Sequence, residues 1–484
     1  MNPPPFSPVA RKMWLCHHTG NTMSIRITCL AACIALAFAP MAHAAAETTA
    51  QAMPETMDML RHAIATQTEQ GKDKVPELAD YIAAKLESAG FAKTDIEIIP
   101  VGHTAALVAH YRGSGKGKPI LLSGHMDVVA ANPKDWTRDP FKLIEENGYI
   151  YGRGSSDMKT NVITLVETMM RFKREGFVPG HEMILVFSGD EETEMATTAE
   201  LAKRYHDAEF LLNADAGGGT FDDKLKPVDY EIQAAEKTYA DFLLTVTSPG
   251  GHSSEPTPDN AIYRLAKALD HVEGYTFPVQ HSEITLASLK AVGKHSSGPL
   301  AEAMLKFSAN PDDAKAAAVI SADPAYVGQL HTTCVATMLD GGHALNALPQ
   351  RATANINCRI FPGVSIDSVQ ATLNTIVADP TVKITVQLPQ PVQSPASPLR
   401  ADIVAAVTST VHERYPDVEI VPGMSAGASD SMYFRNAGVP SYGVSPNFGK
   451  PGDSFAHGLN EKLLASEVPA ALDFWHSLLT KLAK

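Results

Sequence analysis

Residues that commonly bind metal ions recur along the chain, each just after an apolar or glycine-rich stretch. His125 follows the apolar run 120–122, and Asp157 follows the glycine-rich stretch 151–154. The full set of candidates is His125, Asp157, Glu192, Asp215 and His457. Histidine nitrogens and carboxylate oxygens are the usual ligands of catalytic zinc, and a zinc pair can activate water for attack on an amide bond. The spacing therefore predicts a two-zinc centre that hydrolyses amides.

Each candidate ligand has a place in such a centre. A zinc pair needs one bridging carboxylate, terminal ligands on both sides, and an open position for water and substrate. We predict that His125 binds one ion, that His457 binds the other, and that Asp157 forms the bridge. Glu192 and Asp215 would complete the two terminal sets. Cobalt or manganese would fit the same ligands.

Two further carboxylates accompany these ligands. Asp127 is two residues from His125 on the same strand face, where it would accept the ring N–H of that histidine and fix its tautomer. Glu191 precedes Glu192 and points elsewhere, so it would be free to take a proton from the water and pass it to the leaving nitrogen. An acidic run is often only a solvated turn, but its position directly after an apolar strand favours the catalytic role.

The pattern of apolar residues predicts how these side chains are brought together. Helical spacing occurs in 76–90 and 160–174, and strand-like runs occupy 104–112, 119–124, 183–188 and 210–213. Strands that alternate with helices predict an α/β domain with a mainly parallel sheet flanked by helices. In such sheets ligands collect at the carboxyl ends of the strands, where most of the candidates lie.

A second pattern begins near residue 237. Strands are predicted at 241–247, 332–339, 352–361 and 382–388, and helices at 260–272 and 365–377, with an additional helical stretch from about 290 to 330. The order β-α-β-β-α-β is typical of an α+β domain of the ferredoxin-like kind. We therefore expect an inserted domain at 237–388 and a discontinuous catalytic domain formed by 45–236 and 389–484.

The composition favours an exported globular protein. The 484 residues carry 40 basic and 54 acidic side chains without a basic cluster, which argues against a nucleic acid partner. Residues 1–44 resemble a leader and signal peptide, because the apolar stretch 29–41 precedes the cleavage signature Ala42-His43-Ala44. Cys33 also fits a lipoprotein site, but the apolar sequence continues beyond it, so we expect a soluble periplasmic or secreted protein. No other apolar run is long enough to span a membrane.

Two cysteines remain after the leader, Cys334 and Cys358. An oxidising compartment would permit them to form a disulfide. Two buried free thiols would explain the same residues equally well.

Four segments together resemble one known family. They are Ser-Gly-His-Met-Asp-Val-Val at 123–129, Tyr-Gly-Arg-Gly-Ser-Ser-Asp-Met-Lys at 151–159, Gly-Asp-Glu-Glu at 189–192 and His-Gly-Leu-Asn-Glu at 457–461. They are similar to motifs of the zinc-dependent exopeptidases and aminoacylases, which include carboxypeptidase S, the glutamate carboxypeptidases and the N-acyl amino acid hydrolases. The segments around Thr332 and Arg359 resemble the carboxypeptidase S branch most.

The resemblance implies further site residues and a role for the inserted domain as a lid and dimerisation domain. His252 would reach into the site of a partner subunit and polarise the scissile carbonyl. Asn346 and Arg359 would hold the carbonyl and the free carboxylate of the substrate, and Gly427 would lie on the substrate loop. Many relatives carry a glutamate ligand where this chain has Ala216, so Asp215 is expected to take over that position.

These inferences predict an exported two-zinc enzyme that removes a residue or acyl group from a small peptide or N-acyl amino acid with a free carboxylate. The resemblance implies a homodimer through the lid. One rival is an aminopeptidase or dipeptidase with the same site. Another is a peptide-binding relative without activity, but the complete set of ligand-type residues and the presence of Glu191 argue against it.

Overall fold

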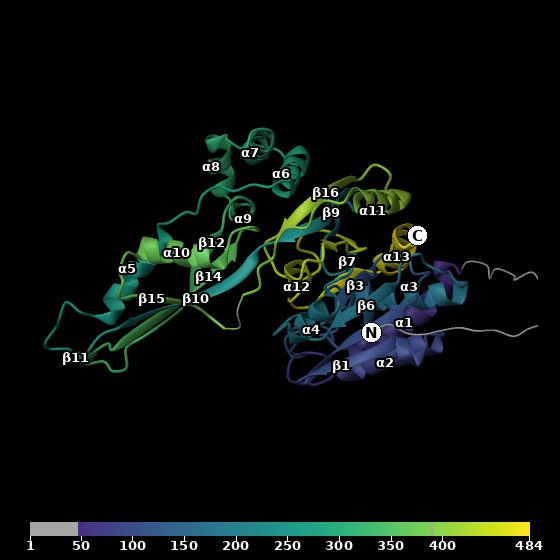
Figure 1. The fold of residues 1–484 in the computed structure, drawn as a ribbon, viewed down its shortest axis with the longest axis horizontal. Helices are drawn as coiled ribbons and strands as arrows, with labels where there is room; N and C mark the ends of the chain where they lie inside the picture. The colour runs from purple at the N-terminus through teal and green to yellow at the C-terminus, as the bar shows by residue number, and fades with distance from the viewer. Residues whose placement is uncertain (1–46, 389–390) are drawn as a thin grey trace, which may run out of the picture. The chain divides into compact units, whose positions relative to one another are not determined.

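The computed structural model describes residues 47–388 and 391–484 (Figure 1). The expected signal peptide and the alternative lipoprotein site at Cys33 lie outside the described residues. Among the described helices, none combines the length and the apolar character that crossing a membrane requires.

The catalytic domain is built on one sheet of ten strands that is parallel at its centre. The strand order is β1-β2-β6-β3-β7-β17-β9-β8-β18, and β16 pairs with β9. The strands are β1 (Ile96–Val101), β2 (Thr104–Tyr111), β3 (Ile120–His125), β6 (Met183–Ser188), β7 (Phe210–Asn213), β8 (Gly218–Phe221), β9 (Pro227–Glu236), β16 (Glu419–Ser425), β17 (Ser441–Gly443) and β18 (Phe448–Gly449). β6, β3, β7 and β17 run parallel to one another, so their carboxyl ends meet at one edge. This confirms the predicted fold class.

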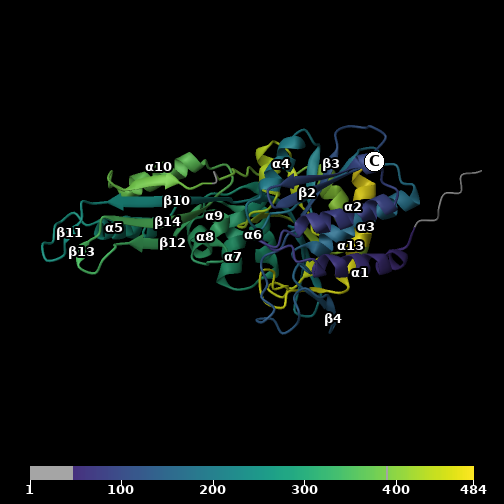
Figure 2. The same ribbon diagram turned by 90° about the horizontal axis from the view of Figure 1, so that it is seen from below.

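Helices cover both faces of this sheet. One face is packed by α1 (Thr49–Ala65), α2 (Val75–Ser88), α3 (Lys159–Glu175), α11 (Ala401–Arg414) and α13 (Glu467–Leu482); α4 (Ala196–Arg204) and α12 (Ser431–Asn436) pack on the other (Figure 2). Leu122 of β3 belongs to the first core and Leu121 to the second. Central parallel strands are buried on both sides, which is why they appear in the sequence as continuous apolar runs.

A small sheet beside the main one carries the remaining site loops. It consists of β4 (Ile144–Glu146), β5 (Tyr149–Tyr151) and β19 (Lys462–Leu464), and a short 3-10 helix, η1 (Lys93–Asp95), precedes β1. Because β5 and β19 pair in antiparallel fashion, the loop that follows residue 151 lies beside the loop that precedes residue 462. This pairing brings Asp157 and His457 together.

The inserted domain has its own antiparallel sheet and core. Its elements are β10 (Thr238–Thr247), α5 (Ala261–Glu273), β12 (Thr333–Gly341), β14 (Arg351–Ile360), α10 (Ile366–Val377) and β15 (Lys383–Val386), in the sheet order β12-β14-β10-β15. This is the β-α-β-β-α-β order expected from the sequence. A short two-stranded sheet of β11 (Gly251–His252) and β13 (Ala347–Leu348) lies beyond the end of β10.

The additional helical stretch begins earlier than the sequence suggested. It comprises α6 (Glu283–His295), α7 (Pro299–Ala309), α8 (Ala314–Ser321) and α9 (Val327–Leu330), which share a small core of their own. α6 packs against β16, and Lys294 Nζ lies 2.6 Å from Glu419 Oε1 on that strand. The insertion therefore packs directly on the catalytic domain.

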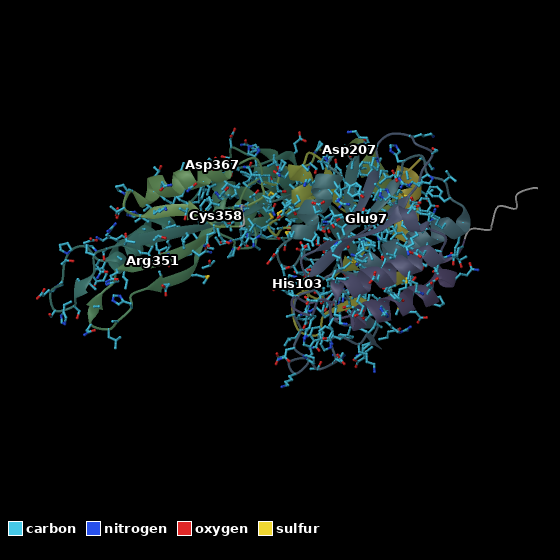
Figure 3. All side chains as sticks on the ribbon, turned by 60° about the horizontal axis from the view of Figure 1, so that its bottom comes forward. Glu97, His103, Asp207, Arg351, Cys358 and Asp367 are labelled. Carbon is cyan, nitrogen blue, oxygen red and sulfur yellow. A yellow bond between two sulfur atoms is a disulfide. The ribbon has the colours of Figure 1, made fainter. Side chains whose placement is uncertain are left out.

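Cys334 and Cys358 form a disulfide, which settles the alternative that the sequence left open. They lie directly opposite each other on β12 and β14. Figure 3 marks Cys358 near one end of β14 and Arg351 at the other. The bond therefore fixes the edge strand β12 beside Arg359.

We expect the double variant Cys334→Ala and Cys358→Ala to lose stability. The disulfide joins residues 24 apart in sequence. Removal of a disulfide that closes a loop of that size typically lowers the free energy of unfolding by about 3 kcal/mol. Urea unfolding monitored by tryptophan fluorescence and circular dichroism measures the loss, and reduced wild-type protein should behave as the double variant does. An unchanged midpoint in both samples would contradict a stabilising role.

Candidate metal centre

The predicted metal ligands converge at the carboxyl edge of the central strands. His125 is the last residue of β3, Glu192 follows β6, and Asp215 follows β7. Asp157 lies in the loop between β5 and α3, and His457 lies in the loop before β19. The structure thus brings together all five residues that the sequence proposed as ligands.

The carboxylate of Asp157 lies between the two histidines. Its Oδ1 is 3.0 Å from His125 Nε2, and its Oδ2 is 3.1 Å from His457 Nε2. Asp215 Oδ1 lies 3.6 Å from the same nitrogen of His125, and Glu192 Oε1 lies 3.0 Å from that of His457. Two sets, each of one histidine and one terminal carboxylate, therefore share Asp157. Their nitrogen and oxygen donors suit divalent metal ions.

The ionisation of these groups reflects their mutual attraction. The hydrogen bond to Asp157, together with Glu192, raises the pKa of His457 to about 9. Burial would raise the pKa of Asp157, but the hydrogen bonds from His125 and His457 outweigh it and hold that pKa below its usual range. Burial raises the pKa of Glu192 to about 7. Metal binding at this site would therefore displace a proton from His457.

Asp127 contacts the site differently from the sequence expectation. His125 Nδ1 lies 3.0 Å from the main-chain carbonyl oxygen of Asp127 and 3.5 Å from its carboxylate. The carboxylate accepts the main-chain N–H groups of Glu191 and Glu192, both at 3.1 Å. Asp127 therefore orients the ring of His125 chiefly through its carbonyl, and it uses its carboxylate to hold the turn that carries the two glutamates.

Glu191 faces the same cavity as the ligands. The cavity has a volume of about 770 Å³, and Asp157, Glu192, Asp215 and His457 also line it. Burial raises the pKa of Glu191 above that of an ordinary glutamate. Within the part of the chain that the structure describes, no side-chain hydrogen bond occupies its carboxylate. Glu191 is therefore placed to exchange protons with molecules in the cavity.

Arg359 and Gly427 line this cavity as well. Arg359 comes from β14 of the inserted domain, and its guanidinium lies over the ring of Tyr239 at 4.6 Å. Its Nη1 donates to the carbonyl oxygen of Ala426 at 3.2 Å. The two contacts fix one edge of the guanidinium and leave other N–H donors for an anionic group.

His252 and Asn346 do not line the metal cavity. His252 lies on β11 and Asn346 directly precedes β13, and these two strands form a separate two-stranded sheet (Figure 2). There the N–H of Ser253 donates to the carbonyl of Asn346 at 3.0 Å. The length of β10 separates this two-stranded sheet from Arg359, which pairs with Tyr239 at the opposite end of β10. Ten strand residues span about 30 Å, and neither side chain lines the cavity. A single chain therefore does not bring these two residues to its own metal centre.

Glu461 is a positioning residue that the sequence reasoning did not assign. Its buried carboxylate accepts Arg153 Nη1 at 2.6 Å and the main-chain N–H of Asp157 at 2.9 Å. The N–H groups of Gly154 and Ser156 bond to it as well, at 3.1 and 2.7 Å. Glu461 thus fixes the loop that presents the shared carboxylate. Its place four residues after His457, in the same motif, was the available signal.

Asn213 has a comparable role for Asp215. Its Oδ1 accepts the N–H of Asp215 at 2.9 Å, and its Nδ2 donates to Ser429 and Ser431 at 3.3 and 3.1 Å. The terminal ligand is thereby tied to the loop that follows β16. Asn213 ends an apolar strand, and an isolated polar residue at that position was a weak signal.

Comparisons with known proteins agree with this geometry. The carboxypeptidase S-like 2 protein of Dictyostelium discoideum, described as probable, is 29% identical over 398 residues, which cover 78% of this chain and 75% of that protein. The human N-fatty-acyl-amino acid synthase/hydrolase PM20D1 is 29% identical over 378 residues, which cover 75% and 74% of the two chains. The probable succinyl-diaminopimelate desuccinylase of Staphylococcus aureus strain Mu50 is 27% identical over 419 residues, which cover 82% and 96%.

Solved structures show the same fold. An M20 family metallo-carboxypeptidase from Sulfolobus solfataricus superposes with a TM-score of 0.66 and 19% identity, and the match covers 89% of this chain and 99% of that one. The dipeptidase Dug1p from Saccharomyces cerevisiae gives a TM-score of 0.63 with 17% identity, covering 90% and 96%. Residues 121–481 match the model of peptidase family M20/M25/M40. The resemblance inferred from the sequence motifs is thereby confirmed, and the chain belongs to this family of metallo-hydrolases.

Proposed function

We propose that the protein is a two-zinc amidohydrolase that cleaves the amide bond of small peptides or N-acyl amino acids with a free carboxylate. The observation that carries this proposal is the Asp157 carboxylate, which is shared by two histidine and carboxylate sets. These sets face a cavity into which Arg359 also projects from the inserted domain. A hydrolytic centre and an anion-binding group are therefore combined in one cavity.

The residues divide the chemical work between them. One zinc ion would be held by His125, Asp157 and Asp215 and the other by His457, Asp157 and Glu192, and bound zinc would polarise the carbonyl and acidify water. Cobalt or manganese would suit the same donors. Glu191 would take the proton from the attacking water and deliver it to the leaving nitrogen, because its carboxylate faces the cavity without being bound elsewhere in the described chain.

Arg359 would select substrates with a free carboxylate. Its planar guanidinium offers paired N–H donors that match the two carboxylate oxygens. The contacts with Tyr239 and Ala426 hold the side chain in place before substrate arrives. Gly427 would keep the adjacent loop close to the bound substrate. Hydrolysis of dipeptides from a free amino end, which would make the enzyme an aminopeptidase or dipeptidase, is the alternative for the same centre.

The protein would act as a homodimer through the inserted domain. β12 is an edge strand of that domain, and Val335, Met338 and Leu339 on it are 58%, 72% and 70% exposed. An apolar edge strand of this length is a template for pairing with another chain. Pairing would also give a role to His252 and Asn346, which in a single chain lie far from the metal centre. The His252 ring would then stabilise the oxyanion in the partner's site.

The protein would be exported to the periplasm or secreted. The disulfide between Cys334 and Cys358 supports an oxidising compartment, because such bonds are rare in reducing cytosol. The charged and apolar pattern of residues 1–44 supports the same destination.

Glu191→Ala should retain its metal and lose most turnover. Removal of a general acid and base typically lowers the rate about 10²- to 10⁴-fold, whereas the metal ligands stay intact. Metal content by atomic emission and steady-state kcat are measured on the same sample. Glu194→Ala, an exposed glutamate in the same turn, is the matched control and should keep wild-type kcat. Wild-type turnover in a metal-loaded Glu191→Ala protein would refute the assigned role.

Arg359→Met should raise KM for substrates with a free carboxylate. Loss of a charge-assisted pair weakens binding by about 10- to 100-fold, and substrates with an amidated end should be unaffected. The test uses N-acyl amino acids and dipeptides with free or blocked ends, and protein stripped of metal and then restored with zinc. Arg359→Lys keeps the positive charge but loses the paired N–H donors of the guanidinium. Its KM should lie between those of the wild-type enzyme and Arg359→Met.

The outcomes of this panel separate the possible functions. Equal cleavage of free and blocked carboxylates would show that Arg359 is not the anchor. A requirement for a free amine would favour the dipeptidase alternative. No cleavage of any compound by protein with two bound metal ions would count against the hydrolase proposal and favour a peptide-binding protein.

Mixing two inactive variants should restore activity if His252 acts in the partner subunit. His252→Ala and Glu191→Ala should each lose most turnover as separate proteins. Random exchange of subunits should give about a quarter of wild-type activity, because half of the dimers then contain one complete site. Activity after mixing and the mass in solution are measured together. If the mixture stays inactive although dimers have exchanged, His252 does not act across the interface.

A further inference from the structure

A second cavity adjoins the metal centre and has no role in the chemistry described so far. Its volume is about 350 Å³, and Glu231, Gln233 and Ser425 are among the residues that line it. Asp215, Gly217 and Ala428 line both this cavity and the metal cavity. The two spaces therefore meet at the terminal ligand Asp215 and at the substrate loop.

The fold leaves room for the two main side chains of this cavity. Glu231 and Gln233 are two residues apart on β9 and therefore lie on the same strand face. A side chain at Gly423 on the neighbouring β16 would collide with the carboxyl group of Glu231. A Cβ at Gly443 on β17 would lie 2.8 Å from Gln233 Oε1. Glycine at both positions thus allows the carboxylate and the amide to lie against bare backbone.

Both side chains present hydrogen-bond acceptors that are not satisfied within the described chain. Gln233 is only 2% exposed, and its Oε1 has no hydrogen-bond partner among the described residues. No hydrogen bond to the Glu231 carboxylate contributes to its ionisation either. Burial, with a smaller contribution from Asp229, raises the pKa of Glu231 to about 7. Buried polar groups are normally paired, so unpaired acceptors at the edge of a substrate cavity indicate a ligand that donates hydrogen bonds.

We propose that this cavity, the Glu231 subsite, binds a primary ammonium group of the substrate between the carboxylate of Glu231 and Oε1 of Gln233. The inference rests on the proposed amidohydrolase function and adds a substrate class to it. An ammonium group carries three donors and no acceptor, and it complements both a carboxylate and an amide oxygen. Its charge would favour the ionised form of Glu231 and replace an unpaired buried acceptor with an ion pair.

Two parts of a substrate carry such a group. One is the side chain of the residue whose carboxylate binds Arg359, because Ala428 borders both the Glu231 subsite and the cavity that contains Arg359. The other is the free α-ammonium of the first residue of a dipeptide, because Asp215 borders the subsite as well as the metal centre. Both sources place a cation against the same two acceptors.

Two matched pairs of compounds test the proposal on the zinc-loaded enzyme. N-acetyl-lysine and N-acetyl-norleucine differ in a side-chain ammonium, and Ala-Ala and N-acetyl-Ala-Ala differ in the α-ammonium. In wild-type enzyme the ammonium compound of one pair should have a kcat/KM at least about tenfold above its neutral partner. Glu231→Gln should lower that ratio about tenfold, and Gln233→Leu should lower it in the same direction.

Asp223→Asn is the matched control, because Asp223 is an exposed carboxylate in the turn before β9 and does not line the subsite. It should preserve the ratio. If Glu231→Gln lowers the kcat/KM ratio in the lysine pair, the subsite binds the side-chain ammonium. If it lowers the ratio in the dipeptide pair, the subsite binds the α-ammonium. Ratios equal to those of wild type in Glu231→Gln, for both pairs, would overturn the subsite and leave the amidohydrolase function standing.

Calorimetric titration with the same four compounds keeps the two proposals separable. If zinc-loaded wild-type protein cleaves none of them, the amidohydrolase function fails for these substrates. Tighter binding of the ammonium compounds that is lost in Glu231→Gln would still support the subsite. Equal affinities for ammonium and neutral compounds in the wild-type protein would overturn it.

Discussion

The carboxylate of Asp157 is the group on which the candidate metal centre depends, because both histidines of that centre contact it. Its position is set by Glu461, a buried carboxylate that would be costly without partners. Arg153 and three main-chain N–H groups compensate that charge and tie the loop of Asp157 to the segment that carries His457. Two segments about 300 residues apart are thus fixed by one set of charge-assisted hydrogen bonds.

The remaining ligands are held in the same manner, through main-chain groups rather than through their own carboxylates. Asp127 holds the N–H groups of Glu191 and Glu192, and Asn213 holds that of Asp215. The carboxylates of the ligands are thereby left free to face the cavity. Asp430, beside the substrate loop, accepts hydrogen bonds from Ser188 and Thr198 behind the same turn. The loop that supports Arg359 through Ala426 is therefore continuous with the support of the metal centre.

Structural features that depend on a local pattern of residues could be predicted from the sequence. Contacts between residues that are remote in the sequence could not. Buried parallel strands appear as apolar runs, so the sheet, the positions of the ligands and the element order of the inserted domain followed directly. The short strand β18 contains too few residues for a pattern. The carboxylate of Glu461 was missed because its partners, Arg153 and the main chain around Asp157, are remote in the sequence. The acceptors on β9 were missed because strand alternation is the same for a residue that faces a cavity and for one that faces a core. His252 and Asn346 could be named from their motifs, but no feature of one chain indicates where a second chain places them.

The charges around the substrate loop suggest how this centre would choose among amides. Ala428 borders both the cavity that contains Arg359 and the cavity that contains Glu231 and Gln233. A substrate that carries both a carboxylate and an ammonium would satisfy both regions. A neutral analogue would leave the partly buried carboxylate of Glu231 and the buried amide oxygen of Gln233 without donors. This penalty discriminates more strongly than any added contact rewards. Selectivity would then arise less from attraction to the correct substrate than from the cost of burying Glu231 and Gln233 beside the wrong one.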